Sequence, residues 1–328
     1  MRGLLCKEFG PFDDLTLETL DAPTPGAGEV AIEVRAAGLN FPDLLIVAGK
    51  YQVRPPLPFV PGGECAGVVA AVGDGVEHVA VGDRVIAMGQ VGAFAETMVV
   101  PAGGVIPMPE SLSFEAAAGV AITYGTSYHA LKQRARLAAD ETLLVLGAAG
   151  GVGLAAVELG KAMGATVIAA ASTSAKLDAA REAGADRTID YSTEDLKKQT
   201  KALTDGRGAD VIVDPVGGAY SEQAFRAIAW DGRHLVIGFA AGDIPRLPLN
   251  LTLLKGANVC GVFWGTWTER DPAASVENFA ELGQMFADGR LRPRITTFPL
   301  AEYRDAFATL AERRAIGKVV LTLGEPAS

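Results

Sequence analysis

The clearest chemical signal in this sequence is a glycine-rich segment, GAAGGVG, at residues 147–153. It follows a short apolar run, TLLVLG (142–147), that is typical of a buried strand, and it opens a stretch (151–163) of helical character. Glycine permits a tight turn and a close approach to a ligand, and the first turn of a helix offers N–H groups to an anion. We therefore predict a loop that binds the pyrophosphate of a dinucleotide. A glycine-rich packing turn is the alternative.

Compared with the dinucleotide pattern G-x-G-x-x-G, this segment has an alanine in place of the first glycine. Ala148, Gly150 and Gly153 occupy the three positions of the pattern. The strand–turn–helix context is the one in which the pattern binds a coenzyme. The loop residues that we expect to contact the coenzyme are Ala149, Gly150, Gly151, Val152 and Gly153.

The end of the next predicted strand, TVIAAAS (166–172), indicates which coenzyme is preferred. An acidic residue near this position would bind the ribose hydroxyls of NAD. No acid is present, and Ser172, Thr173, Ser174 and Lys176 stand there instead. Hydroxyls and a cation suit a 2′-phosphate, so we expect NADPH rather than NADH, held by Ser172 and Lys176. The alternative is that the two serines are helix caps and Lys176 is a solvated surface residue.

The elements around this loop alternate regularly along the second half of the chain. Continuous apolar strands separated by amphipathic helices indicate a parallel sheet covered on both faces, so the fold class is α/β with a doubly wound sheet. The predicted strands are 142–147, 166–172, 186–191, 209–217 and 234–239, and the predicted helices are 151–163, 174–183, 192–203 and 219–229.

The first ~120 residues have a different sequence pattern. Short predicted strands are separated by Gly- and Pro-rich turns, which predicts a compact β-rich domain. The predicted strands are 15–20, 29–38, 64–73, 83–89 and 93–100. A helical segment then runs over 113–135 with Ser113 as its N-cap. The end of the chain predicts helix 275–288, strand 295–298, helix 301–313 and strand 318–323.

The composition excludes several classes of protein. A net charge of −10 without a basic stripe argues against nucleic acid as a partner. Three scattered cysteines (Cys6, Cys65 and Cys260) form no C-x-x-C pair, which excludes a structural zinc lobe and suits a reducing compartment. The N-terminus does not resemble a secretory signal and no apolar stretch of about 18 residues occurs, so we expect no membrane partner and a cytoplasmic location.

Six segments spread over nearly the whole chain carry a family resemblance: AGLNFPDLLIVAGKY (37–51), PGGECAGVVAAVGDGV (61–76), VGDRV (81–85), GAFAE (92–96), GAAGGVG (147–153) and IGKVVL (316–321). Together they resemble the medium-chain dehydrogenase/reductase superfamily, and specifically its zinc-independent NADPH:quinone oxidoreductase branch, which includes zeta-crystallin-like proteins.

The resemblance implies a discontinuous domain organisation. It implies a GroES-like catalytic domain from residues 1–122 and 264–328, and a Rossmann nucleotide-binding domain from residues 123–263, with a cleft between the two. It also implies a homodimer. In the family a strand near 258–263 often pairs across the dimer, although NVCGVF suits a buried strand equally well.

The resemblance also indicates which chemistry to expect. Zinc-dependent relatives carry a Cys where this chain has Asn40 and a His where it has Gly63, so we expect no metal. Without a Lewis acid, alcohol oxidation is disfavoured, and hydride transfer to a quinone or another α,β-unsaturated carbonyl compound is favoured. The alternatives are an enoyl-thioester reductase and an NADPH-binding protein with a structural or regulatory role and little turnover.

Residues of the expected active site follow from the same resemblance. Tyr51 matches a proton donor of related enoyl-thioester reductases, and Asn40 matches a residue near the nicotinamide; their alternatives are an edge aromatic and a turn-stabilising amide. Glu64 matches an acid with a structural ion-pair role. Trp264 and Trp267 would line an apolar pocket or form core. The remaining coenzyme residues implied by the family, each with core packing or a surface ion pair as its alternative, are Thr126, Tyr191, Phe239, Phe263 and Lys318.

Overall fold

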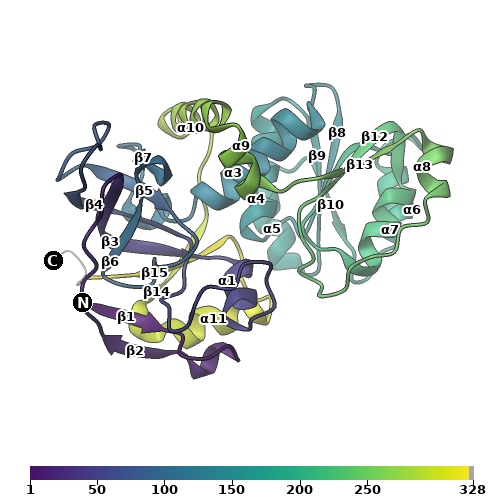
Figure 1. Cartoon of the computed structure of the whole chain (residues 1–328). Coiled ribbons are helices and arrows are strands. Elements are labelled where there is room, and N and C mark those ends of the chain that lie inside the picture. Colours follow the sequence, from purple (N-terminus) through teal and green to yellow (C-terminus); the bar gives the residue numbers. More distant parts are fainter. Residues whose placement is uncertain (325–328) are drawn as a thin grey trace. The chain divides into compact units, whose positions relative to one another are not determined.

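The structure is a computed structural model that describes residues 1–324 (Figure 1). The chain divides into two compact units, which are considered separately. The first comprises residues 1–121 and the described residues from Pro293 onward, and the second is Ile122–Arg292. Residues 325–328 of the predicted catalytic domain lie outside the described residues.

The first unit is built on a mixed sheet in which β3 (Glu29–Leu39) is central. Its order is β14-β15-β3-β4-β5-β7, and β6 also pairs with β3. Strand β15 comes from the end of the chain and pairs antiparallel with β3, so both ends of the chain build this unit. The other strands of this sheet are β4 (Glu64–Val72), β5 (Arg84–Met88), β6 (Thr97–Pro101), β7 (Val105–Pro107), β14 (Ile295–Pro299) and β15 (Lys318–Thr322). A separate antiparallel sheet consists of β1 (Arg2–Leu5) and β2 (Thr16–Thr19).

The core of the first unit lies between this sheet and three helices, α1 (Phe41–Val47), α2 (Phe114–Ala117) and α11 (Tyr303–Ala311). Phe94 and Phe307 are fully buried and meet edge-to-face, with ring centroids 5.9 Å apart. Aromatic pairs of this kind stabilise a core beyond the area that they bury. Ser113 caps α2 as predicted, because its side chain accepts a hydrogen bond from Ala116 N.

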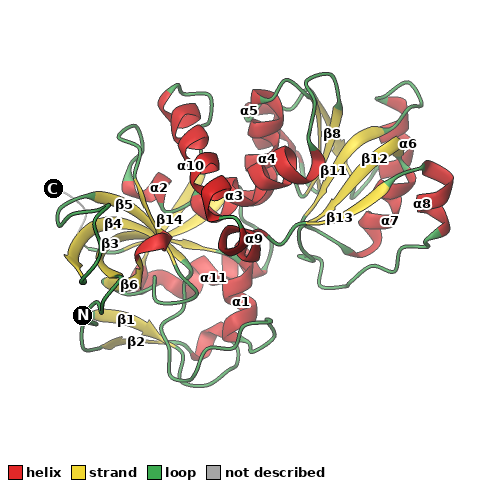
Figure 2. Ribbon diagram, turned by 45° about the horizontal axis from the view of Figure 1, so that its top comes forward, coloured by secondary structure: helices red, strands yellow, loops and turns green. Residues whose placement is uncertain are grey.

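The second unit contains a parallel sheet with the order β10-β9-β8-β11-β12-β13 (Figure 2). The strands are β8 (Thr142–Leu146), β9 (Thr166–Ala171), β10 (Arg187–Asp190), β11 (Ala209–Asp214), β12 (Ile228–Val236) and β13 (Asn258–Gly261). Consecutive strands spread to one side from β8 and then to the other from β11. The order therefore reverses between these two strands, which is where ligands bind in sheets of this kind.

Helices cover both faces of the parallel sheet, as its apolar strands require. In Figure 1, α4 (Gly151–Ala162) and α5 (Ser174–Glu182) lie on one face of it. On the other face lie α6 (Leu196–Ala202), α7 (Gly218–Arg226) and α8 (Asn250–Lys255). The predicted α/β fold class is confirmed.

Some element boundaries differ from those predicted. Strand β1 was not predicted. The helical segment 113–135 is interrupted: α2 ends at Ala117, α3 spans Ala121–His129, and a π-helical turn covers Ala130–Ala135. Strand β12 begins at Ile228, six residues before the predicted start, because Ile228 already pairs with Ala209 of β11.

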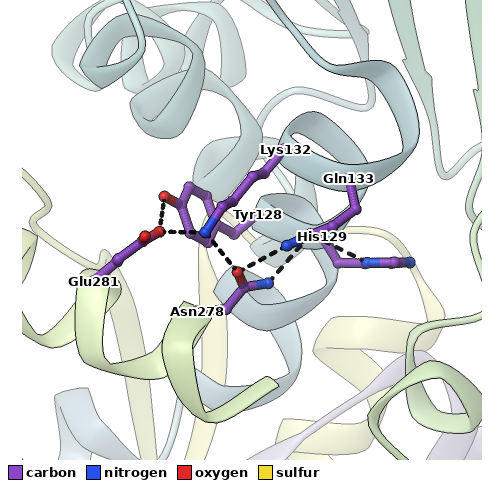
Figure 3. Close-up of polar contacts among 6 residues, drawn as sticks. All are labelled: Tyr128, His129, Lys132, Gln133, Asn278 and Glu281. Atoms are coloured by element: carbon purple, nitrogen blue, oxygen red, sulfur yellow. Dashed lines mark hydrogen bonds and ion pairs between the residues drawn. The ribbon is translucent and has the colours of Figure 1, made fainter. Parts of the chain in front are cut away.

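The boundary of the second unit also differs from the predicted domain boundary. Residues 264–292 were assigned to the catalytic domain, but they contact α3 through α9 (Trp264–Arg270) and α10 (Pro272–Ala287). Figure 3 shows the polar contacts among them, which come from α3 and from the π-helical turn that follows it. Lys132 pairs with Glu281 at 2.7 Å, Tyr128 donates to the same carboxylate, and Gln133 donates to Asn278. These contacts join α10 to the helix that opens the second unit.

We find no helix in residues 1–324 with the length and apolar character that crossing a membrane demands.

Candidate coenzyme loop and buried polar cluster

The predicted phosphate loop follows β8, whose five residues are all buried. Gly147 has φ +57°, in the left-handed region that glycine adopts readily. At Gly153, an added Cβ would lie 2.2 Å from Gly147 O, and no side chain fits in that space. Ala148 N donates to Ala170 O of β9 at 3.1 Å, which fixes the turn to the neighbouring strand. Gly147 and Gly153 are therefore required by the turn itself.

Gly150 has no such internal reason to be glycine. It is the N-cap residue of α4, with φ −76° and ψ 170°, which any residue can adopt. An added Cβ would meet nothing closer than Gly147 O at 3.5 Å, an ordinary contact. The first-turn N–H groups of α4 have no acceptor within the helix, and a glycine cap leaves them accessible to an anion. This arrangement fits the pyrophosphate of a dinucleotide.

The start of α4 is held by α3, which carries Thr126. Ser127, the next residue, donates its hydroxyl to Val152 O at 3.0 Å. Both Thr126 and Ser127 are buried. The structure therefore brings the helix that carries Thr126 beside the predicted phosphate loop.

The end of β9 lies beside the end of β10, where Tyr191 N donates to Ala171 O at 3.1 Å. Ser172 follows Ala171 directly, so Ser172 and Tyr191 lie at the same edge of the sheet. The ring of Tyr191 packs against that of Tyr220, with centroids 4.3 Å apart. The N-cap of α5 is Thr173, whose side chain accepts from Lys176 N. The alternative that Ser172 and Ser174 are the caps is therefore wrong, because the cap is the residue between them.

Asp214, at the end of β11, organises a part of the site that the sequence analysis missed. Its carboxylate accepts from Val216 N and Gly217 N, both at 2.9 Å, and from the Ser221 hydroxyl and His234 Nε2. Burial raises the pKa of Asp214, but these hydrogen bonds, first that from His234, outweigh burial and lower it. An acidic residue that ends an apolar strand, as in ADVIVD, is the local sequence signal, but it does not distinguish a buried carboxylate from a solvated one.

The turn held by Asp214 joins two other segments of the site. The side chain of Val216 lies against Gly147, because a Cβ added to Gly147 would come within 2.8 Å of Val216 Cγ2. Ala240 N and Ala241 N donate to Pro215 O and Val216 O. The segment that includes Phe239 is therefore attached to the phosphate loop through this turn, whereas Phe263 follows β13 and is 62% exposed.

In the first unit, three predicted residues lie near each other. Lys318 Nζ donates to Asn40 Oδ1 and lies 2.5 Å from Glu64 Oε1, and Asn40 Nδ2 donates to the same Glu64 oxygen at 2.9 Å. Glu64 is an ion-pair partner, as expected, but the pair is buried, so Lys318 is not a surface residue. We call Asn40, Glu64 and Lys318 the buried triad.

Asp43 completes this region and was not predicted. Asn40 N donates to Asp43 Oδ2 at 2.7 Å, which is one half of a capping box at the start of α1, and Asp43 N donates to the backbone oxygen of Asn40 at 3.0 Å. The N-x-x-D spacing in NFPD was the available signal. Burial, and to a lesser degree the charge of Glu64, raise the pKa of Asp43 to about 7, against opposing effects of the Asn40 N–H and Lys318.

Tyr51 is half-buried and packs against the core of the first unit. Burial and the charge of Asp43 raise the pKa of its hydroxyl. The hydroxyl therefore stays protonated throughout the neutral range, as a proton donor must before it reacts.

Trp264, Trp267 and His129 form packing contacts. Trp267 stacks on His129 with ring centroids 4.1 Å apart, and Trp264 lies against Gly125, where an added Cβ would come within 2.5 Å of its ring. Both tryptophans therefore pack on α3. Within residues 1–324, no three His, Cys, Asp or Glu side chains are grouped so that they could hold a metal ion.

Two family models match the chain: the alcohol dehydrogenase GroES-like domain at residues 26–110, and the zinc-binding dehydrogenase domain at residues 151–281. A quinone oxidoreductase-like protein 2 homolog from Nematostella vectensis is 40% identical over 327 residues, or 98% of this chain and 88% of that protein. The crystal structure of Escherichia coli quinone oxidoreductase complexed with NADPH has a TM-score of 0.92 at 29% identity, over 98% of this chain and 100% of that one. A quinone oxidoreductase from Pseudomonas syringae pv. tomato also has a TM-score of 0.92, at 32% identity over 98% and 99% of the two chains.

Proposed function

We propose that this chain, which belongs to the quinone oxidoreductase branch of the medium-chain dehydrogenase/reductase family of oxidoreductases, uses NADPH to reduce quinones or other α,β-unsaturated carbonyl compounds. The observation that carries the proposal is the loop at residues 147–153. It lies where the strand order reverses, and Gly150 keeps the start of α4 open to an anion. The E. coli relative, in which the same fold was solved with NADPH, supports the choice of coenzyme.

The end of β9 supports NADPH over NADH. Ser172 and Lys176 supply a hydroxyl and a cation, and no carboxylate of β9 stands there to repel a 2′-phosphate. Tyr191, whose backbone is bonded to Ala171, would cover the adenosine end of the coenzyme. The other coenzyme contacts that we propose are Asn40, Thr126, Ala149, Gly150, Gly151, Val152, Gly153, Phe239, Phe263 and Lys318.

When bound, NADPH supplies a hydride. Addition of a hydride to a conjugated carbonyl compound or a quinone creates negative charge on the substrate oxygen or the adjacent carbon, and that position then needs a proton. Tyr51 would supply it, since its raised pKa keeps the hydroxyl protonated until the charge develops. Asn40 would orient the reacting groups by hydrogen bonding.

We propose that this reaction uses no metal. The positions that carry Cys and His in zinc-dependent relatives are Asn40 and Gly63. Glycine offers no ligand, and the amide of Asn40 is already bonded to Lys318 and Glu64. These residue types suit an acceptor that is already polarised and needs no Lewis acid.

We also propose a homodimer formed through β13, which is the last strand of the parallel sheet and has no further strand beside it within residues 1–324. Val259 of this strand is 47% exposed, and Leu253 of α8 is 79% exposed. A second copy of the chain would cover these side chains. Light scattering measures the oligomeric state. The scattered cysteines suit a reducing compartment such as the cytoplasm.

The test is the oxidation of NADPH and NADH by the purified chain, measured with quinones, 2-alkenals and crotonyl-CoA. We expect NADPH to be preferred and quinones or alkenals to be reduced. Preference for crotonyl-CoA would instead indicate an enoyl-thioester reductase. Tight binding of NADPH without turnover of any acceptor would indicate a binding protein with a structural or regulatory role. Absence of NADPH binding would refute the proposal.

The choice between the two coenzymes is tested by Lys176→Met. Loss of the cation should weaken NADPH binding by about 10-fold, as expected for one charge-assisted hydrogen bond, and should leave NADH binding unchanged. The matched control is Lys197→Met, which removes an exposed lysine of α6 and should change neither affinity. Equal losses for both coenzymes in Lys176→Met would contradict the assignment.

A further inference from the structure

The buried triad holds the side chain of Asn40 in one orientation. Asn40 Nδ2 donates to Glu64 Oε1 at 2.9 Å and to Gly38 O at 3.2 Å. Asn40 Oδ1 accepts from Lys318 Nζ. The three side chains are buried, with relative exposures of 7% for Asn40, 0% for Glu64 and 5% for Lys318.

The chemistry of the two neighbours makes this orientation the only favourable one. An ammonium group has donors and no acceptor, and a carboxylate has acceptors and no donor. Rotation of the amide by 180° would place its NH₂ against the Lys318 ammonium and its oxygen against the Glu64 carboxylate. In a buried site, both contacts would be strongly unfavourable. The ion pair therefore determines which end of the amide faces which way.

The backbone packs closely around the triad. A Cβ on Gly38 would lie 2.3 Å from Ala118 O and 2.7 Å from Glu64 Oε1. A Cβ on Gly119 would lie 2.9 Å from Lys318 Cγ. The backbone of Asn40 is itself fixed by its hydrogen bond to Asp43. The backbone therefore packs closely against Glu64 and Lys318 at these two glycines.

This arrangement limits what Asn40 can offer to a ligand. An amide NH₂ group has two hydrogens, and the contacts with Glu64 and Gly38 use both. An amide oxygen has two lone pairs, and the contact with Lys318 uses one. The second lone pair of Oδ1 is what remains for hydrogen bonding.

We propose that Glu64 and Lys318 are positioning residues that restrict Asn40 to accepting a hydrogen bond, so that it recognises a donor on the nicotinamide half of NADPH. The donor is the carboxamide NH₂ or a ribose hydroxyl. This inference rests on the proposed function, because it concerns how that coenzyme is recognised. It gives the direction of the hydrogen bond, in which Asn40 accepts and the ligand donates.

The experiment exchanges the charge between two positions of the triad. Asn40→Asp alone places a second carboxylate against Glu64, and we expect it to weaken NADPH binding by at least about 10-fold, a loss equivalent to one hydrogen bond. The double variant Asn40→Asp/Glu64→Gln has the wild-type net charge. In the double variant the amide at position 64 donates to the carboxylate at position 40, which still accepts from Lys318 and can accept from the ligand. The same amide also meets the Lys318 ammonium, however, and the carboxylate faces Gly38 O. We therefore expect the double variant to bind NADPH more tightly than Asn40→Asp does but less tightly than wild type.

Two ligands separate the proposal from a general loss of structure. Binding of 2′,5′-ADP, which lacks the nicotinamide half, should be the same in all variants if they are folded. A reduced 3-acetylpyridine analogue of NADPH lacks the carboxamide NH₂. If Asn40 accepts from that group, the analogue should bind wild type more weakly than NADPH does, and Asn40→Leu should remove the difference. If Asn40 accepts from a ribose hydroxyl, Asn40→Leu should weaken the binding of NADPH and of the analogue equally.

Three results would overturn the inference. The first is a double variant that binds 2′,5′-ADP normally but binds NADPH no more tightly than Asn40→Asp does. The second is an Asn40→Leu variant with wild-type affinity for both coenzymes. The third is wild-type protein that binds 2′,5′-ADP and NADPH equally tightly, which would mean that the nicotinamide half makes no net contact. Failure of wild type to bind NADPH at all would refute the proposed function instead.

Discussion

Gly150→Ala distinguishes a phosphate-binding loop from a packing turn. In the folded protein the new methyl group would meet only Gly147 O, at 3.5 Å, and the backbone angles suit alanine. Alanine is a poorer N-cap than glycine by up to about 1 kcal/mol, and the reduced entropy of the unfolded chain offsets part of this cost. We therefore expect the free energy of unfolding to change by less than about 1 kcal/mol.

The same methyl group would stand where the pyrophosphate must approach the start of α4. Losing a hydrogen bond to a charged group costs about 1.5–3 kcal/mol. Affinity for NADPH should therefore fall by about 10- to 150-fold. Fluorescence titration measures the dissociation constant, and thermal unfolding of the same samples measures stability.

Two further variants serve as controls. Gly153→Ala would place a Cβ 2.2 Å from Gly147 O, so it should lower stability by at least about 2 kcal/mol as well as binding. Gly103→Ala has no atom within 4 Å of the new Cβ and should change neither property. The reasoning is refuted if Gly150→Ala is as stable as wild type and binds NADPH with the same affinity, because the segment would then be a packing turn.

Three other predictions concern groups buried around the two parts of the site. The pKa of Asp43 is raised to about 7, so between about pH 4 and 7 the unfolded chain releases a proton that the folded chain retains. The melting temperature should therefore fall as the pH rises through this range. In Asp43→Asn this fall should be absent, and a pH profile identical to that of wild type would contradict the prediction. His234→Leu removes a donor to the buried Asp214 carboxylate, so urea denaturation should show a loss of about 1–3 kcal/mol, and wild-type stability would argue against the role of this hydrogen bond. Gly125→Ala brings a methyl group to 2.5 Å from the ring of Trp264, so it should lower the melting temperature and change the fluorescence of Trp264, and an unaltered spectrum would show that α9 does not pack as described.

The sequence predicted the elements with strong periodicity and missed features that depend on contacts distant along the chain. The strand, loop and helix around Gly147–Gly153 were predicted closely, because the apolar run and the glycines are local signals. The assignment of residues 264–292 to the catalytic domain differs from the observed unit, because the contact between Lys132 and Glu281 joins residues far apart in sequence.

The site shows the same division. Asn40 and Lys318 were singled out by family resemblance, but their mutual contact spans most of the chain and has no local sequence signal. Asp43 was recoverable in principle, since the capping box is a short-range pattern. The buried carboxylate of Asp214 was overlooked because a polar residue at the end of a strand looks solvated until the neighbouring strand places His234 beside it.

The pairing of β15 with β3 has a consequence for how the chain folds during its synthesis on the ribosome. Ile122–Arg292 is continuous and can complete its sheet while the chain is still being made, whereas the first unit waits for its closing strand. Until that strand is available, Glu64 lacks Lys318, its ion-pair partner in the folded unit. Burial of that acid is therefore deferred until the strand that carries Lys318 has been made and has left the ribosome.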